Sequence, residues 1–250
     1  MLTRSRYAGG LAAIVALLFL LATLPARLVS YWLPQEARLA GITGTLWHGY
    51  AARASVDILG KSVHLGALNW SLKPWSLLLL SPDVNFSSRW GSQNLSGRVA
   101  VGVSGQVTLT DLNGSIDIRF LRELLPLYVG GELQFQGVNA VLALDERINV
   151  KQLSGRVLWQ KAVWAASMGD VALGNYVLDW GEGKGPISAQ LLTLSGPLEL
   201  AGQVALDSNR YRVDITLRGP AVRNTRLSDS FRLLAAPVAD GFDLKLEGNF

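Results

Sequence analysis

Few residues in this chain have the chemistry of a catalytic centre, and their spacing does not assemble one. The sequence of 250 residues has two histidines, His48 and His64, and no cysteine. Cysteine catalysis, cysteine-ligated zinc and disulfides are therefore excluded. The histidines do not fall in a metal-binding spacing such as His-x-x-x-His, and a catalytic triad would have to use one of them. His48 follows Trp47 in a turn bounded by glycines, so we interpret it as a surface or turn residue.

Two glycine-rich segments match phosphate-binding loops only in part. Gly60-Lys61-Ser62 ends like a P-loop, but Ser55 stands where that motif needs a glycine. Residues 181–185 lack the strand-then-helix context of a phosphate site, so we interpret them as the tip of a hairpin. Three carboxylates could act as an acid–base pair only if folding gathered them: Asp170, Asp179 and Glu182. The sequence thus predicts no enzyme, no cofactor and no metal site.

The elements that would position any site read as short strands. Apolar and polar residues alternate most clearly in Tyr211–Arg218 and Phe242–Glu247. Since side chains on a strand point to opposite faces in turn, each segment buries one face and leaves the other in solvent. The dipeptides Asn113-Gly114, Gly130-Gly131 and Asp240-Gly241 are typical of turns between strands. Helices long enough to cross over between parallel strands are almost lacking, so the sheet should be antiparallel.

These patterns predict an all-β fold with a curved, mostly antiparallel sheet, preceded by one N-terminal transmembrane helix. Alternation alone does not decide between an open half-barrel and a sandwich. A weak internal repeat relates residues 44–47 to residues 155–159 and Trp70 to Trp180. We therefore expect two β-rich halves, 39–130 and 131–250, with chance similarity among glycine-rich strands as the alternative.

Three short segments predict helices that depend on the sheet for stability. The first runs from Lys73 to Leu80, with Pro74 at a first helical position. The second covers residues 121–125. The third covers residues 228–236, with Ser228 as its N-cap.

The N-terminal segment predicts a membrane anchor. Residues 7–24 carry no charge and follow Arg4 and Arg6. At ~1.5 Å per residue a helix over this run spans ~27 Å, close to the roughly 30 Å hydrocarbon thickness of a bilayer. A cleaved signal peptide is the alternative, but its apolar region is usually shorter and ends in a small-x-small site that is missing here. The predicted order is a cytoplasmic stub (1–6), a transmembrane helix (7–26), a linker (27–38) and a periplasmic β-rich domain (39–250).

The charge distribution gives no sign of nucleic-acid binding. The formal net charge is +4, with 23 basic and 19 acidic residues in the chain. The basic residues are scattered singly and form no stripe on one element.

Several motifs resemble those of the type II secretion system protein N family, also called general secretion pathway protein N. The resemblance rests on three segments: Leu39-x-Gly41-x-x-Gly44-Thr45-Leu46-Trp47-x-Gly49-x-Ala51, then Leu68-x-Trp70-x-Leu72-x-Pro74, then Gly241 to Gly248. The Gly-Thr-Leu-Trp-x-Gly segment is the most specific part. The family signature, with a structural or docking role, is Gly44, Thr45, Leu46, Trp47, Gly49, Trp70 and Pro74.

The resemblance implies a bitopic inner-membrane protein with an accessory role in the apparatus that exports folded proteins across the outer membrane. Its implied partners are inner-membrane and periplasmic subunits of that system, and no catalytic residues carry over. The family is also distantly similar to AsmA-like proteins, which implies a lipid-handling groove as the alternative. A membrane-anchored hydrolase is the third possibility, and no nucleophile–base pair in the sequence supports it.

Overall fold

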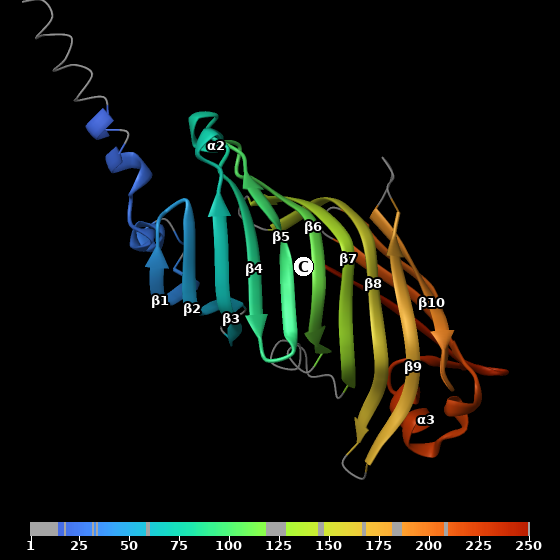
Figure 1. Ribbon diagram of the computed structural model, residues 1–250. Helices are drawn as coiled ribbons and strands as arrows, with labels where there is room; N and C mark the ends of the chain where they lie inside the picture. Colours follow the sequence, from blue (N-terminus) through green and yellow to red (C-terminus); the bar gives the residue numbers. More distant parts are fainter. Residues whose placement is uncertain are drawn as a thin grey trace, which may run out of the picture. The chain divides into compact units, whose positions relative to one another are not determined.

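The computed structural model describes residues 15–17, 19–31, 33, 35–58, 61–118, 129–144, 148–166, 169–181, 187–207 and 210–249. The chain divides into two compact units, residues 1–90 and residues 91–250. Both are built of antiparallel strands, as predicted (Figure 1). The duplication into residues 39–130 and 131–250 stays a prediction.

The first unit is a four-stranded antiparallel sheet in which sequential strands pair. Its elements are the 3-10 helix η1 (Ala26–Tyr31), strands β1 (Ala37–Gly44), β2 (His48–Ile58) and β3 (Lys61–Leu72), helix α2 (Pro74–Leu78) and strand β4 (Asp83–Trp90). Ala26 of η1 packs against Ala51 and Trp70 on one face of this sheet. Leu39, Ile42 and Leu68 extend this cluster of apolar side chains, so η1 covers β1, β2 and β3 on that face.

The second unit is a longer antiparallel sheet with one exchange of order at its end. Its strands are β5 (Gln93–Val101), β6 (Gln106–Asp117), β7 (Val129–Leu144), β8 (Ile148–Ala166), β9 (Gly169–Trp180), β10 (Ile187–Ser195), β11 (Glu199–Asp207), β12 (Arg210–Arg218), β13 (Ala236–Val238) and β14 (Gly241–Asn249). They follow the order of the sequence up to β12, which pairs with β14, and β14 pairs with β13. This order is linear and the sheet is open. Of the two forms that alternation alone left undecided, the protein therefore adopts the open sheet and not the sandwich.

The long strands of the second unit bend along their length (Figure 1). The register shifts between β6 and β7, β7 and β8, and β8 and β9, and such bulges bend a strand and increase its twist. The prediction that Asn113-Gly114 forms a turn is wrong, because both residues lie inside β6 at such a shift. Gly114 has φ +132°, and a Cβ there would collide with the carbonyl oxygen of Asn94. The Asn113 side chain accepts a hydrogen bond from the Gly137 amide at 2.9 Å.

The dipeptide Gly130-Gly131 is also part of a strand and not a turn. It lies near the start of β7, where the register against β8 shifts. Asp240-Gly241, in contrast, connects β13 to β14 as predicted. Glycine and asparagine therefore mark bulges in this sheet as well as turns.

The core of the second unit lies between one sheet face and two helical segments, η3 (Pro220–Arg223) and α3 (Thr225–Arg232). Leu227 of α3 is fully buried and belongs to one cluster with Tyr176, Leu217 and Phe242 from strands β9, β12 and β14. The alternation predicted over residues 211–218 is confirmed, since most polar side chains of β12 are exposed whereas its apolar side chains are partly or fully buried. Over residues 242–247 it is confirmed only in part, because Phe242 is buried whereas Leu246 is 41% exposed.

Of the three predicted helices, the first is confirmed but ends at Leu78, and the third is wrong in both bounds, since α3 ends at Arg232 and not at residue 236. Helix α2 begins at Pro74. Helix α3 begins at Thr225, so Ser228 is inside it and donates its hydroxyl to the Thr225 carbonyl at 3.0 Å, whereas the Asn224 carbonyl accepts the Ser228 amide. The predicted helix over residues 121–125 lies outside the described residues.

The N-terminal segment is described only from residue 15 onwards. Residues 15–17 and 19–22 are α-helical, and their apolar side chains, such as Val15 and Phe19, are exposed. Of the predicted span at residues 7–26, residues 7–14 and 18 lie outside the described residues. The predicted end of the span is wrong, because the helix stops before Thr23, Pro25 forms a β-bridge with Thr45, and Ala26 belongs to η1. Within the described part of the chain, none of the helices combines the length and the hydropathy that a membrane crossing requires.

Candidate functional site

The family signature forms one compact arrangement in the first unit, starting with the tight loop between β1 and β2. The Thr45 amide donates to the His48 carbonyl at 2.9 Å, and the His48 amide donates to the Thr45 hydroxyl at 3.2 Å. Gly44 has φ +90°, and a Cβ there would lie 2.5 Å from the His48 carbonyl oxygen. Glycine is therefore required at position 44 for this loop to close.

Leu46, at the centre of the loop, points into the unit and is 2% exposed. Its amide donates to the Leu24 carbonyl at 2.8 Å, and its carbonyl accepts the Trp70 indole N–H at 3.1 Å. The loop backbone is thereby joined to the segment after the N-terminal helix on one side and to β3 on the other.

Gly49 and Trp70 form a matched pair on neighbouring strands. They are register partners in the β2–β3 ladder. A Cβ on Gly49 would collide with Cζ2 of the Trp70 indole, so the ring lies directly over the glycine. The glycine in the signature thus makes room for the tryptophan that follows 21 positions later in the chain.

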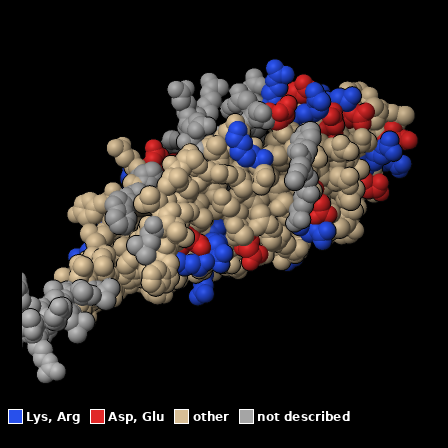
Figure 2. All heavy atoms as spheres, turned by 90° about the horizontal axis from the view of Figure 1, so that it is seen from above, with Lys and Arg blue, Asp and Glu red and all other residues tan. Residues whose placement is uncertain are grey.

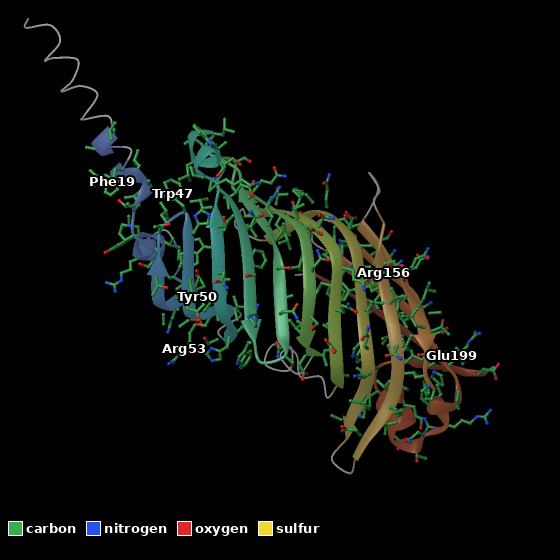
Figure 3. All side chains as sticks on the ribbon, in the orientation of Figure 1. Phe19, Trp47, Tyr50, Arg53, Arg156 and Glu199 are labelled. Carbon is green, nitrogen blue, oxygen red and sulfur yellow. The ribbon has the colours of Figure 1, made fainter. Side chains whose placement is uncertain are left out.

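Trp47 connects the loop to the N-terminal helix. Its indole N–H donates to the Leu21 carbonyl at 2.8 Å, and its own carbonyl accepts the Leu72 amide at 2.8 Å. Figure 3 shows Trp47 beside the helix that carries Phe19. Pro74, the remaining signature residue, starts helix α2 just after β3. The structure therefore brings all seven signature residues to one end of the first unit.

An apolar groove of about 700 Å³ opens beside this arrangement. Leu21 and Ala22 line it from the N-terminal helix, Trp47 from the loop, and Trp75 and Leu77 from α2. From the sequence, residues 73–80 were predicted only as a short helix, and this surface was not predicted. The sequence contains a signal for such a surface, because residues 74–80 form an uncharged run without strand alternation.

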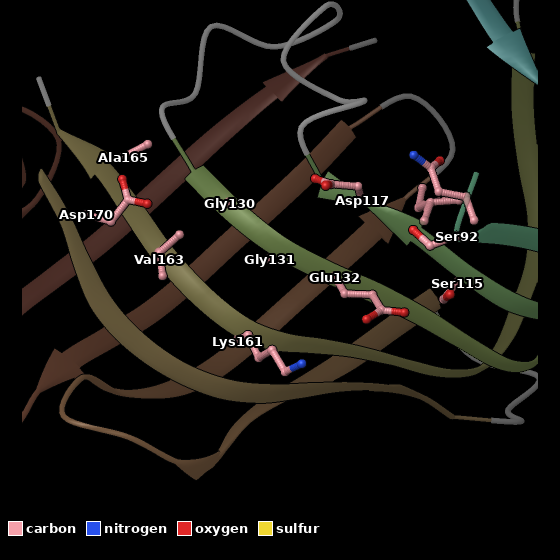
Figure 4. A pocket seen from close by; sticks show the side chains of 12 residues that line it. Ser92, Ser115, Asp117, Gly130, Gly131, Glu132, Lys161, Val163, Ala165 and Asp170 are labelled. Carbon is pink, nitrogen blue, oxygen red and sulfur yellow. The ribbon is translucent and has the colours of Figure 1, made fainter. Parts of the chain in front are cut away.

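A polar cavity of about 450 Å³ lies in the second unit (Figure 4). Its charged side chains are Asp117, Glu132, Lys161 and Asp170, on strands β6 to β9, and serines line its rim. Neither histidine lines it. Among the residues that the structure describes, no group of three or more His, Cys, Asp or Glu side chains could hold a metal ion.

The dispersed carboxylates are not brought together. Asp170 and Asp179 lie near the two ends of β9, which at ~3.3 Å per residue places them roughly 30 Å apart along the strand. Asp179 forms a bidentate ion pair with Arg156, at 2.5 and 3.0 Å, and this pair raises the pKa of the guanidinium. Glu182, Gly60 and most of the loop at 181–185 lie outside the described residues.

The two histidines have different surroundings, and neither suggests a catalyst. His48 is exposed at the start of β2. His64 lies on β3, with its ring centroid 6.1 Å from that of Trp90 in an edge-to-face arrangement. The environment of His48 is thus a loop at the surface, and that of His64 is an aromatic ring.

Replacing Trp47 by phenylalanine is expected to loosen the attachment of the N-terminal helix. The loss of one hydrogen bond, about 0.5–1.5 kcal/mol, should raise tryptic cleavage after the exposed Arg27 by roughly twofold to tenfold. Digestion of the full-length protein in detergent measures the rate. Trp75→Phe, at a 77% exposed position on the same groove, is the control and should leave it unchanged.

The fold and this arrangement define a class, namely an open antiparallel β-sheet protein whose distinctive residues join an N-terminal helix to the sheet. The family model described as "Type II secretion system (T2SS), protein N" matches residues 35–245. The chain therefore belongs to the type II secretion system protein N family and is a type II secretion component.

Three individual relatives are similar in sequence to this chain over most of its length and of their own. The chain is 30% identical over 247 residues to the type II secretion system protein N of Aeromonas hydrophila, covering 92% of each protein. It is 29% identical over 226 residues to the protein of that name from Vibrio cholerae, covering 84% of this chain and 83% of the relative. For the Klebsiella pneumoniae protein the identity is 29% over 228 residues, covering 84% and 82%. No solved structure matches the chain significantly.

Proposed function

We propose that this protein is an accessory component of the type II secretion apparatus, anchored in the inner membrane, that acts by docking to other subunits. Family membership over residues 35–245 is the observation that carries this proposal. The partners would be inner-membrane and periplasmic subunits of the same system. In this role the protein binds other subunits through its surface and catalyses no reaction.

The anchor would be the uncharged N-terminal segment, with its amino end in the cytoplasm and the sheet in the periplasm. Two features support this. The sequence over residues 7–24 has the length and hydropathy of a span. The described helical residues 15–17 and 19–22 expose Val15, Leu17 and Phe19, which a soluble helix would have to bury.

The docking edge is strand β1. An edge strand offers backbone donors and acceptors to an added strand, and natural proteins protect such edges with short length, proline or charge. β13 is protected in this way, since it has three residues and contains Pro237. β1 has eight residues, no proline and one charged side chain, Arg38, so it is the better template.

Charge does not select the partner. On the face seen in Figure 2, the coloured Lys and Arg side chains mix with Asp and Glu. Recognition through backbone pairing at β1 needs no patch of one sign, which agrees with the scattered charge of the sequence.

The double variant Ala40→Lys/Thr43→Lys tests the edge. Both side chains are exposed on β1, so the fold should be retained while an added strand meets two new charges. We expect co-purification of other secretion subunits with the tagged full-length protein to fall roughly tenfold, and secretion to fall with it.

Ala201→Lys/Gln203→Lys is the matched control, because both residues are exposed on β11, which pairs on both sides. It should leave co-purification unchanged. If other secretion subunits co-purified equally well with the two variants, β1 would be excluded as the docking edge. Secretion that survives deletion of the gene would contradict the proposed function itself.

The alternative, a lipid-handling groove formed by the apolar sheet face, has weaker support. In the second unit η3 and α3 pack onto that face around Leu227, which leaves this part of it covered. Lipid that co-purifies with gently extracted protein, found by mass spectrometry, would favour the alternative.

A further inference from the structure

We propose that the β3–β4 connection at residues 74–80, which consists of helix α2 and the turn after it and is referred to as the apolar loop, inserts Trp75, Leu79 and Leu80 into the surface of the bilayer beside the N-terminal helix. This inference rests on the anchoring in the proposed function and adds a second membrane contact to it. The occupant of the groove and of the loop's exposed side is therefore phospholipid.

The apolar loop exposes the side chains that a water-facing connection avoids. Trp75, Leu79 and Leu80 are 77%, 78% and 69% exposed within a single β-strand connection. The loop contains no charged residue between Pro74 and Leu80. Tryptophan is enriched at the headgroup level, and leucine favours the acyl region below it. Such a concentration of exposed apolar area marks an interaction surface.

Leu80 adds a second, independent signal because its backbone is in the left-handed region, with φ +52°. Glycine or asparagine adopts this conformation at much lower cost. A leucine here is unfavourable in water both for its backbone and for its exposed side chain. Strained residues of this kind persist where they serve a function, and contact with lipid would use this side chain.

The side-chain hydroxyl of the apolar loop and the charges at its base are paired within the protein, which lowers the cost of insertion. The Ser76 hydroxyl donates to the Lys73 carbonyl at 2.6 Å and accepts the Asp83 amide at 3.0 Å. The Ser76 carbonyl accepts the Ser81 amide at 3.0 Å. At the base, the Lys73 ammonium and the Asp83 carboxylate pair at 2.7 Å. The side chains that the apolar loop exposes are therefore two leucines and the indole of Trp75.

The groove fixes the depth of the apolar loop relative to the anchor. Leu21 and Ala22 of the N-terminal helix line the same groove as Trp75 and Leu77. The Trp47 indole donates to the Leu21 carbonyl, and the Trp47 carbonyl accepts the Leu72 amide at the end of β3, so Trp47 connects the N-terminal helix to the strand that precedes the apolar loop. Since the uncharged run of the predicted span ends at residue 24, Leu21 lies near the membrane boundary, and the apolar loop lies at the same level.

The absence of cysteine from the sequence permits a direct test. The full-length protein with Leu79→Cys, labelled with an environment-sensitive fluorophore, is reconstituted in vesicles of phosphatidylethanolamine and phosphatidylglycerol that carry nitroxide lipids. Because interfacial side chains reach ~5–10 Å below the headgroups, we expect roughly twofold quenching by the shallow nitroxide. Ser62→Cys, at an exposed position of the first unit near the start of β3, is the control and should not be quenched, because at ~3.3 Å per residue it lies roughly 30 Å along the strand from the apolar loop.

A second variant separates insertion from chance proximity. Trp75→Ser with Leu80→Asn, placed in the Leu79→Cys protein, should return quenching to the level of the Ser62 label. Quenching at Leu79 no greater than at Ser62 would overturn the inference and assign the apolar loop to a protein partner. Release of the protein from vesicles by alkaline carbonate would instead refute the anchoring, so the two failures are distinguishable.

Discussion

Replacing Trp70 by alanine is expected to lower the free energy of unfolding of the first unit by about 3–5 kcal/mol. Trp70 is 8% exposed, lies over Gly49, and belongs to the cluster of Ala26 and Ala51 beneath η1. Truncation would remove the largest side chain of that cluster and leave the Leu46 carbonyl without its indole donor. Urea unfolding of the full-length protein in detergent, followed by circular dichroism, measures the change.

Two further variants separate the part of this lost free energy of unfolding that comes from packing from the part that comes from hydrogen bonding. Trp70→Phe keeps an aromatic ring but removes the donor, and a buried carbonyl without a partner costs about 1–3 kcal/mol. Trp90→Ala, at a 47% exposed position of β4, is the control and should cost less than about 1 kcal/mol. If Trp70→Ala and Trp90→Ala destabilised the protein equally, the signature would have no role in packing.

The second unit contains an arrangement like the one between Trp70 and Leu46 in the first. Leu198 is buried in the connection between β10 and β11, after Gly196 and Pro197, as Leu46 follows Gly44 and Thr45. The Leu198 amide donates to the Leu173 carbonyl at 3.0 Å, and its carbonyl accepts the Tyr176 hydroxyl at 2.9 Å. In each unit a buried aromatic side chain thus donates a hydrogen bond to the backbone carbonyl of a buried leucine.

Local alternation in the sequence predicted parts of this sheet, such as β12 and β14. In β12 the apolar face is more buried than the polar face, whereas Leu246 of β14 is 41% exposed. Local pattern could not show that Asn113-Gly114 continues β6. The glycine there accommodates the carbonyl of Asn94 on the neighbouring strand, and that contact exists only after the sheet has formed.

The candidate site was predictable in its residues and not in its geometry. The signature segment pointed to residues 44–49, Trp70 and Pro74. Nothing in the spacing showed that Trp47 bonds to Leu21, because that contact joins residues 26 positions apart across an irregular segment. The repeat seen in the sequence also matched the loop at residue 44 with residue 155, whereas its structural counterpart in the second unit begins at Gly196.

Replacing Tyr176 by alanine is expected to destabilise the second unit by about 3–5 kcal/mol. Tyr176 is fully buried, its ring centroid is 5.5 Å from that of Trp159, and it packs in the cluster that holds Leu227. Tyr176→Phe should cost about 1–3 kcal/mol, because the ring remains while the Leu198 carbonyl loses its donor. Urea unfolding measures both, and Tyr50→Phe, at a partly exposed position, is the control.

The pH dependence of the same variant distinguishes the buried hydroxyl from ring packing. Burial raises the pKa of Tyr176 above its ordinary value of about 10. The neutral hydroxyl therefore contributes stability that is fully present below about pH 10 and is lost, at up to ~1.4 kcal/mol per pH unit, as the pH rises from there through the folded pKa. Tyr176→Phe lacks this contribution, so its disadvantage relative to the unmodified protein should shrink above about pH 10. A difference that stays constant from neutral to alkaline pH would show that the hydroxyl ionises with the same pKa in the folded protein as in the unfolded chain, and would contradict this prediction.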